Sequence, residues 1–284
     1  MYKPLLGKML ADLRAQILAW GLGMGSLLVL TVLVYPSISS SYSDIMRELP
    51  EGLTAFLGGD FSVESLEGYL NAEFIMYAPM ALGVFAIIAG TGSIVSEENQ
   101  ETLDILLAQP LPRLRLILIK MTALIMGNGV VVAILLAMFW LTIPFVDIEV
   151  KAGRLIAALT LLWPFLTTIS FLSLALSLVL PGRAFAGTVM AGLLVISFVL
   201  GSLANLVSWL EPLRPIYLMS YYQGSNSLLS EISWSYTIGL IGIMAMAMFL
   251  SVWLFLRREI AVQRPIGFMF IRKAVSHMVT RRRD

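Results

Sequence analysis

The chain has 284 residues, of which 58% are hydrophobic and 13% are charged, with a mean hydropathy of +0.88 and a formal net charge of +1. Soluble domains carry about 25% charged residues, so the low charge and the long apolar runs exclude an ordinary soluble domain and predict an integral membrane protein. Cysteine is absent, and the single histidine, His277, lies in a basic tail. Disulfides, thiolate metal sites and imidazole chemistry within the membrane are therefore excluded.

Several segments are long and apolar enough to cross a bilayer, which takes about 20 mostly apolar residues per helix. Each run is continuously apolar and lacks the alternation that barrel strands show. The sequence therefore predicts an all-α membrane protein with six transmembrane helices. These helices are predicted at residues 16–35, 74–95, 116–145, 155–180, 184–210 and 236–256.

Lysine and arginine are concentrated in the segments that share one side of the membrane with the N-terminus. The segments on the other side hold only Arg47, Lys151, Arg154 and Arg214. Because positive residues favour the cytoplasmic side, we predict a multi-pass protein of the cell membrane with both termini in the cytoplasm. The predicted cytoplasmic cations are Lys3, Lys8, Arg14, Arg113, Arg115, Lys120, Arg183, Arg257, Arg258, Arg264, Arg272, Lys273, Arg281, Arg282 and Arg283.

The two segments that flank the first span have different characters. Residues 1–15 place apolar side chains at helical spacing, with Lys3 and Lys8 off that face. This pattern predicts an amphipathic elbow helix that lies on the inner leaflet and then turns into the span; the alternative is a simple extension of the span. Residues 36–73 form the largest polar region on the outer side. Their serines and prolines predict a loop, with a short surface helix near residues 62–67.

Two spans carry pairs of small residues. Gly21 and Gly25 form a G-x-x-x-G pair in the first span, and Gly187 and Ala191 form a similar pair in the fifth. Such pairs let helix backbones approach closely. The sequence alone leaves open whether they pack within one chain or between two chains.

Residues 97–113 read EENQETLDILLAQPLPR and form a dense acidic cluster between the second and third spans. Residues 101–108 have room for about two helical turns before prolines end the helix. Leu103 and Leu106 share one face of this helix, whereas Ile105 points almost opposite. Apolar groups on both faces favour burial against the membrane domain on one side and a second protein on the other. An ordinary turn with solvated acids and buried leucines is an equal alternative.

The spans carry uncharged polar residues but no ionisable residue deep within them. Asn128, Thr167, Ser170 and Asn205 are candidates for a substrate path, although hydrogen bonding between helices is the more common role of such residues. The absence of a deep charge argues against an ion-driven transporter, a membrane metalloprotease or a serine hydrolase, so we assign no catalytic residue. No Gly-rich loop ending in Gly-Lys-Ser/Thr occurs, so we predict no nucleotide site on this chain.

Two further segments flank the sixth span. Residues 211–235 are half apolar and rich in tyrosine, with Tyr217, Tyr221 and Tyr222 at positions that suit the membrane interface. A segment that dips partly into the outer leaflet is one possibility for them. The basic tail at 257–284 has helical apolar spacing, which is typical of a helix on anionic lipid. Nucleic-acid binding is a less favoured interpretation of this tail, because the segment is short and attached directly to a span.

The acidic stretch also carries a resemblance. GTGSIVSEE at 90–98, followed by TLDILLAQPLPR at 102–113 and by Lys120, resembles the signature of ABC-2 type transporter permeases. The sequence is most similar to the six-span permeases of the group that includes the one serving copper-enzyme maturation. FLRRE at 255–259 resembles the ending of that group, and the likeness covers the whole chain. Glu101 departs from the pattern, because the family commonly has glycine there.

The resemblance implies a coupling helix at 97–109 that docks into a groove on a separate ABC ATPase subunit. It further implies two permease chains with two ATPase subunits, spans one and five facing the second chain, and no cofactor on this chain because ATP and magnesium bind to the partner. The small pairs Gly21, Gly25, Gly187 and Ala191 then become candidates for permease dimer packing. The expected carriers of the coupling are Glu97, Glu98, Glu101, Thr102, Leu103 and Leu106.

The sequence therefore favours the permease subunit of an ATP-driven exporter of a lipid, peptide or amphipathic compound. Two other classes stay open at this point. One is a secondary transporter or channel that works without ATP. The other is a membrane scaffold or a lipid-modifying protein.

Overall fold

The computed structural model describes residues 2–47, 50, 65–99, 112–145, 152–204, 206–225 and 233–257, and this part of the chain is helical without a strand. The predictions for Asn205, for residues 100–111 and for the tail after Arg257 lie outside the described residues. The helices are α1 (Tyr2–Arg47), α3 (Leu66–Leu70), the π-helix η1 (Asn71–Ile75), α4 (Ala78–Asn99), α6 (Arg113–Thr142), the 3-10 helix η2 (Ile143–Phe145), α7 (Ala152–Val179), α8 (Arg183–Leu203), the 3-10 helix η3 (Ser208–Ile216), α9 (Leu218–Ser225) and α10 (Trp234–Arg257).

The prediction of an all-α protein with six membrane-spanning helices is confirmed by the helix lengths and composition. Six described segments are long and apolar enough to cross a membrane. A helix pairs most of its backbone groups internally, which an apolar environment requires. The six segments are Leu5–Ser39, Leu66–Ile94, Arg113–Phe145, Gly153–Val179, Arg183–Leu203 and Trp234–Arg257.

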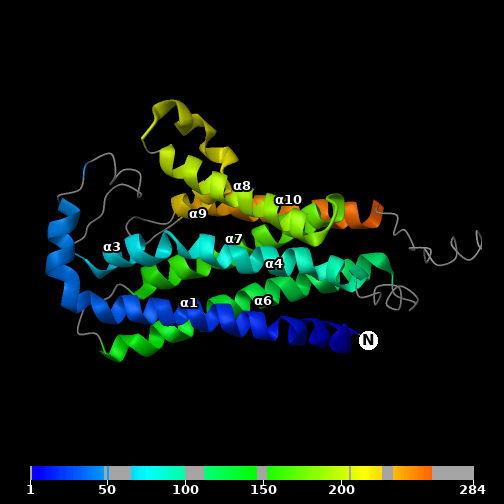
Figure 1. Cartoon of the computed structure of the whole chain (residues 1–284), viewed down its shortest axis with the longest axis horizontal. Helices are drawn as coiled ribbons and strands as arrows, with labels where there is room; N and C mark the ends of the chain where they lie inside the picture. Colours follow the sequence, from blue (N-terminus) through cyan, green and yellow to red (C-terminus); the bar gives the residue numbers. More distant parts are fainter. Residues whose placement is uncertain are drawn as a thin grey trace, which may run out of the picture.

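The first helix is much longer than the predicted first span, with 46 residues from Tyr2 to Arg47. Pro4 lies in the first turn, where its missing N–H is not needed, and residues 2–15 continue directly into the span (Figure 1). An elbow helix that turns into the span is therefore not confirmed. At the other end, Pro36 lies inside the helix, so residues 36–47, which were predicted to be part of a loop, are helical. Figure 1 shows the helix turning away from the bundle in this part, as expected because proline kinks a helix.

The second span also begins earlier than predicted. Ser65 caps α3, since its Oγ accepts a hydrogen bond of 3.2 Å from the Gly68 N–H. A short surface helix was predicted near residues 62–67, of which residues 62–64 lie outside the described part; the observed helix is Leu66–Leu70, and both Leu66 and Leu70 are buried. The π-helix η1 then carries the chain into α4.

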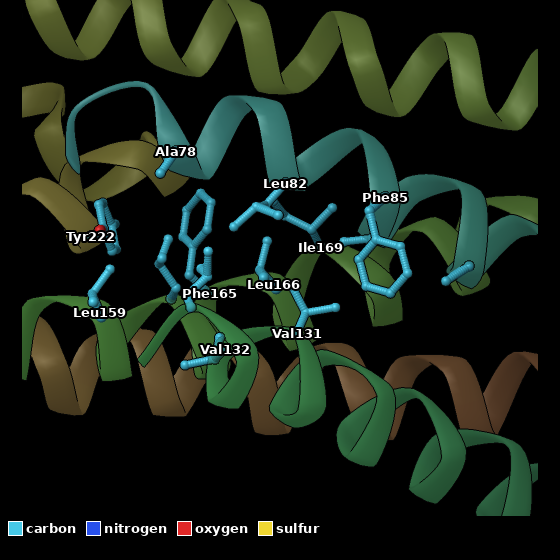
Figure 2. Close-up of a cluster of buried hydrophobic side chains, with 14 of the residues drawn as sticks. Ala78, Leu82, Phe85, Val131, Val132, Leu159, Phe165, Leu166, Ile169 and Tyr222 are labelled. Carbon is cyan, nitrogen blue, oxygen red and sulfur yellow. The ribbon is translucent and has the colours of Figure 1, made fainter. Parts of the chain in front are cut away.

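The core lies along α7, which contacts α4, α6, α8, α9 and α10. Figure 2 shows Leu82 of α4 and Phe165, Leu166 and Ile169 of α7 among the buried side chains, each with 0% of its surface exposed. In contrast, α1, α8 and α10 expose large apolar side chains such as Phe249, which is 71% exposed. In a bilayer this apolar outer surface faces lipid or another membrane helix at no cost.

The segment between the fifth and sixth spans folds onto the bundle. After α8, the 3-10 helix η3 leads into α9, which contacts α7, α8 and α10. Tyr217 and Tyr222 are buried, whereas we predicted an interfacial position for them. The Tyr222 ring packs against Phe165 with 5.3 Å between the ring centroids. The tyrosines of this segment are therefore partly core residues, because the chain folds back over the end of α7.

Candidate functional site

The predicted coupling segment connects two neighbouring spans at one end of the bundle. The helix α4 ends at Asn99, and α6 begins at Arg113 with Pro112 as its N-cap in an extended conformation. Glu97 and Glu98 belong to the last turn of α4 by their backbone. Their side chains, together with Glu101, Thr102, Leu103 and Leu106, lie outside the described residues.

That end of the bundle is also where positive charge gathers. The start of α1 and the ends of α4 and α10 lie together in Figure 1, at the right of the view. We call this end of the bundle the cation-rich end. Its described charged side chains are Lys8, Asp12, Arg14, Arg113, Arg115, Lys120, Arg183 and Arg257. The described charged side chains at the opposite end of the bundle are Glu67, Glu73, Arg154, Glu211 and Arg214.

Two cations of the cation-rich end reach the backbone of α4. The Lys120 Nζ of α6 donates a short hydrogen bond to the Ser93 carbonyl, and its side chain is 0% exposed. The Arg183 Nη2 of α8 donates to the Ile88 carbonyl at 3.1 Å. Gly92 makes room for this guanidinium, because a Cβ at that position would lie 3.0 Å from the Arg183 Nη2.

Sequence reasoning placed both cations at the inner membrane surface and missed their contacts with α4. One signal was present in the sequence. Arg183 occupies the first turn of α8, where the helix dipole disfavours a cation. A cation in that position needs a stabilising partner elsewhere, and the partner here is the carbonyl of a neighbouring helix.

The structure brings three of the four predicted substrate-path residues together in the core. The Asn128 Nδ2 donates to the Ser170 Oγ at 3.1 Å and lies 3.5 Å from the Thr167 Oγ1. The Ser170 Oγ in turn donates to the Ala86 carbonyl of α4 at 3.3 Å. Each of the three side chains is at most 1% exposed. They link α4, α6 and α7 by hydrogen bonds, and the Asn128 Oδ1 is buried without a partner.

Close helix contacts surround this cluster. A Cβ on Gly90 of α4 would lie 2.3 Å from the Ser170 carbonyl oxygen, so α4 and α7 touch backbone to backbone there. The predicted pair Gly21 and Gly25 also packs within the chain, in this case against side chains of α6. A Cβ on Gly21 would lie 2.8 Å from the Ile134 Cδ1 of α6, and both glycines are buried.

The second small pair has a more open setting. Gly187 and Ala191 of α8 line a groove of about 870 Å³ that runs between α4 and α8. Ile87 contacts Gly187 from α4, since a Cβ on the glycine would lie 3.7 Å from its Cγ2. The groove is lined mainly by apolar and small side chains, with Arg183 at its end.

A second apolar cavity of about 600 Å³ lies between α6, α7 and α10. Its wall includes Trp163, whose Nε1 donates to the Ile125 carbonyl at 2.9 Å, and Thr160 and Pro164 of α7. Proline has no N–H, so Pro164 cannot pair with the Thr160 carbonyl as a helix normally would. The cavity wall is mainly apolar, with a few polar groups on α7 and Thr237 on α10.

The six long apolar helices, the cation-rich end and the hydrogen-bonded polar side chains between the helices define a multi-pass helical membrane protein. The chain belongs to the ABC-2 family of transporter proteins, whose family model matches residues 11–260. It is thus an ABC-2 type permease, the membrane component of an ABC transporter. Such a component is in general not the catalytic part, and the family implies an ABC ATPase as partner. No curated protein matches the chain in a sequence comparison.

Proposed function

We propose that the chain is the permease subunit of an ATP-driven exporter, and that residues 97–109 couple it to a separate ATP-binding subunit. The observation that carries this proposal is the family match, which includes the segment between α4 and α6. The cation-rich end supports the orientation, because the positive-inside rule puts it in the cytoplasm together with this segment. ATP and magnesium then belong to the partner, which carries the phosphate-binding loop.

The coupling role can be tested with leucine-to-aspartate variants. Affinity-tagged chain is purified from its native membranes, and co-purification of a protein with a G-x-x-x-x-G-K-S/T loop is measured. We expect Leu103→Asp or Leu106→Asp to abolish co-purification, because a charge desolvated at an apolar interface is costly. The control is Leu213→Asp, a partly exposed leucine at the opposite end of the bundle. Unchanged recovery of the ATPase with both coupling variants would overturn the proposal.

We further propose that two copies of the chain pair through α1 and α8. The family resemblance implies that spans one and five face the second chain, and both helices offer apolar faces for such a contact, with Leu22 49% and Ile196 54% exposed. Because the chain has no cysteine, a single introduced cysteine reports contact directly. We expect Ile196→Cys to form a disulfide-linked dimer in membranes and Phe249→Cys of α10, which is 71% exposed, to stay monomeric. The reverse pattern would place the interface elsewhere.

The substrate is proposed to be a lipid, a peptide or an amphipathic compound that is exported. The apolar cavity between α6, α7 and α10 supports this class, because its mainly apolar walls suit apolar ligands better than small ions. ATP-dependent uptake into inside-out vesicles tests the class and the direction together. Uptake of a fluorescent lipid or of a hydrophobic dye is the expected result. ATP-driven accumulation in right-side-out vesicles would contradict export.

A further inference from the structure

The cavity between α6, α7 and α10 lies in the half of the bundle away from the cation-rich end. It is lined by residues within 153–167, in the first half of α7, and within 234–244, at the start of α10. Further along, the same two helices are in direct contact, because the Ser251 Oγ of α10 donates to the Phe171 carbonyl of α7 at 2.9 Å. The two helices therefore pack closely near the cation-rich end and leave a hollow between them in the other half.

The cavity opens on the surface that faces lipid, because Trp163 and Ile241 of its wall are exposed. Its volume of about 600 Å³ lies within the range of ligand sites, about 300–1,000 Å³. A membrane-spanning helix about 10 Å wide and 30 Å long occupies about 2,400 Å³, so a helix of a second chain does not fit into it. The cavity therefore suits a small molecule that enters sideways from the bilayer.

The side-chain hydrogen-bond donors inside the cavity are already used within the protein. The Trp163 Nε1 donates to a carbonyl of α6 at 2.9 Å. The hydroxyls of Thr160, Thr167 and Thr237 each donate to the carbonyl four residues earlier, at 2.6, 2.8 and 3.2 Å. The indole of Trp234 is the other side-chain donor of the described wall, but this first residue of α10 is 68% exposed and lies at the mouth. Inside the cavity a ligand therefore meets acceptors and no unused side-chain donor.

One acceptor of the wall lacks its ordinary partner. In a regular helix the Thr160 carbonyl receives a hydrogen bond from the N–H of residue 164, and Pro164 has no N–H. Both residues line the cavity, and a helix carbonyl points toward the residue four positions later, so this oxygen lies at the wall. An unpaired backbone group is costly in hydrocarbon. A ligand that donates a hydrogen bond to this oxygen removes that cost.

These features select one kind of ligand. The described wall holds no charged side chain, so it offers no partner for the charge of an anionic lipid or an ion. A peptide would bring several carbonyl groups that find no donor inside the cavity. We propose that the cavity binds an uncharged lipid with a hydroxyl group, whose apolar part fills the hollow and whose hydroxyl donates to the Thr160 carbonyl. This inference deepens the proposed function, on which it rests for treating the ligand as the exported compound.

Photolabelling of the full chain in lipid nanodiscs, without the ATPase subunit, tests the site. The probes are octadecanol with a diazirine in its chain and the methyl ether of the same molecule, which lacks the donor. Mass spectrometry identifies the labelled peptides, and half-maximal labelling of residues 153–167 and 234–244 is expressed as the mole fraction of probe in the nanodisc lipid. We expect the alcohol to label this site at an about fivefold lower mole fraction than the ether, which is the effect of one ordinary hydrogen bond.

Three variants separate the hydroxyl contact from the apolar fit. Pro164→Ala supplies an N–H for the Thr160 carbonyl, so the preference for the alcohol should disappear while the ether labels as before. Ala157→Phe fills the cavity, and both probes should lose this labelling. Ala245→Phe is the matched control, because Ala245 is exposed on α10 and lies outside the wall, and it should behave as the natural chain does. Partitioning of a probe into the nanodisc is the same for every variant and cancels in the comparison.

A preference for the alcohol that is absent from the natural chain, or that survives in Pro164→Ala, would overturn the hydroxyl contact. Unchanged labelling of Ala157→Phe would overturn the site itself.

Failure of the proposed function has a different signature. The assembled transporter should accumulate the alcohol probe in inside-out vesicles when ATP is supplied. Binding as expected without that accumulation would show that the ligand is not the exported compound. Accumulation without the expected binding pattern would overturn the inference and leave the proposed function intact.

Discussion

Replacing Gly90 with alanine tests whether the contact between α4 and α7 is as close as the structure shows. The added Cβ would lie 2.3 Å from the Ser170 carbonyl oxygen and 2.8 Å from the Ser173 Cβ. An ordinary contact begins near 3.4 Å, so the two helices must separate by about 1.1 Å. The obstacle is a backbone oxygen within a helix and cannot rotate away as a long side chain could. The separation would also stretch the 3.3 Å bond from Ser170 to Ala86.

The expected loss of stability follows from three contributions. Overpacking a core costs about 1–3 kcal/mol, and the loss of one buried hydrogen bond costs about 1 kcal/mol. Alanine is about 1 kcal/mol better than glycine inside a helix, which offsets part of this loss. The net destabilisation is then about 2 kcal/mol. For a domain of 150–250 residues, about 2–4 °C of midpoint is lost per kcal/mol, so we expect the midpoint to fall by roughly 4–8 °C.

The assay is thermal unfolding of the purified protein in one detergent, followed by tryptophan fluorescence. The matched control is Gly23→Ala in α1, because a Cβ there meets no atom within 4 Å. That variant should keep or slightly raise the midpoint. If Gly90→Ala were as stable as Gly23→Ala, the helices would not be in backbone contact, and the reasoning about Gly90 would be refuted.

Three other substitutions probe the interior by the same assay. Tyr222→Phe loses only a 3.5 Å hydrogen bond to the Ala158 carbonyl, so we expect less than about 1 kcal/mol of change at pH 7. Burial raises the pKa of the Tyr222 phenol above its ordinary value of 10.0, so the natural chain should lose stability as pH rises above 10, where only the unfolded phenol ionises. Tyr222→Phe should lose less stability over that range, and equal losses would contradict the burial of this phenol. Asn128→Leu removes an acceptor that is buried without a partner, while Ser170 keeps its own hydrogen bond to α4. We therefore expect the free energy of unfolding to change by less than about 1 kcal/mol. A loss of stability as large as that of Gly90→Ala would contradict this expectation. Ser251→Ala breaks the 2.9 Å bond from α10 to the Phe171 carbonyl and should cost about 1 kcal/mol, with faster hydrogen exchange in α10; unchanged exchange would argue against that contact.

Some parts of the fold and the site could be predicted from the sequence because they depend on local composition. The six spans follow from continuous apolar runs. The structure adds that Pro112 is the N-cap of α6, a position that tolerates its missing N–H. The full length of the first helix was not predicted. Serine and proline are typical of loops, and the sequence does not show that residues 36–47 continue the helix. Hydrogen bonding between helices was expected as the more common role of polar residues in the spans, but only the tertiary structure shows that Asn128 and Ser170 bond to one another.

What the sequence alone determined is the class of the protein: its continuous apolar runs fix the helical character and the number of spans, and the GTGSIVSEE stretch carries the family likeness. The tertiary structure alone decided which helices touch. Whether Gly21 packs within the chain, whether Lys120 ends in water or on a carbonyl, and whether Tyr222 lies at the interface or in the core depend on neighbours far away in the chain. Composition sets the preference of a segment for lipid or water, but a contact between side chains requires two segments to be placed in space.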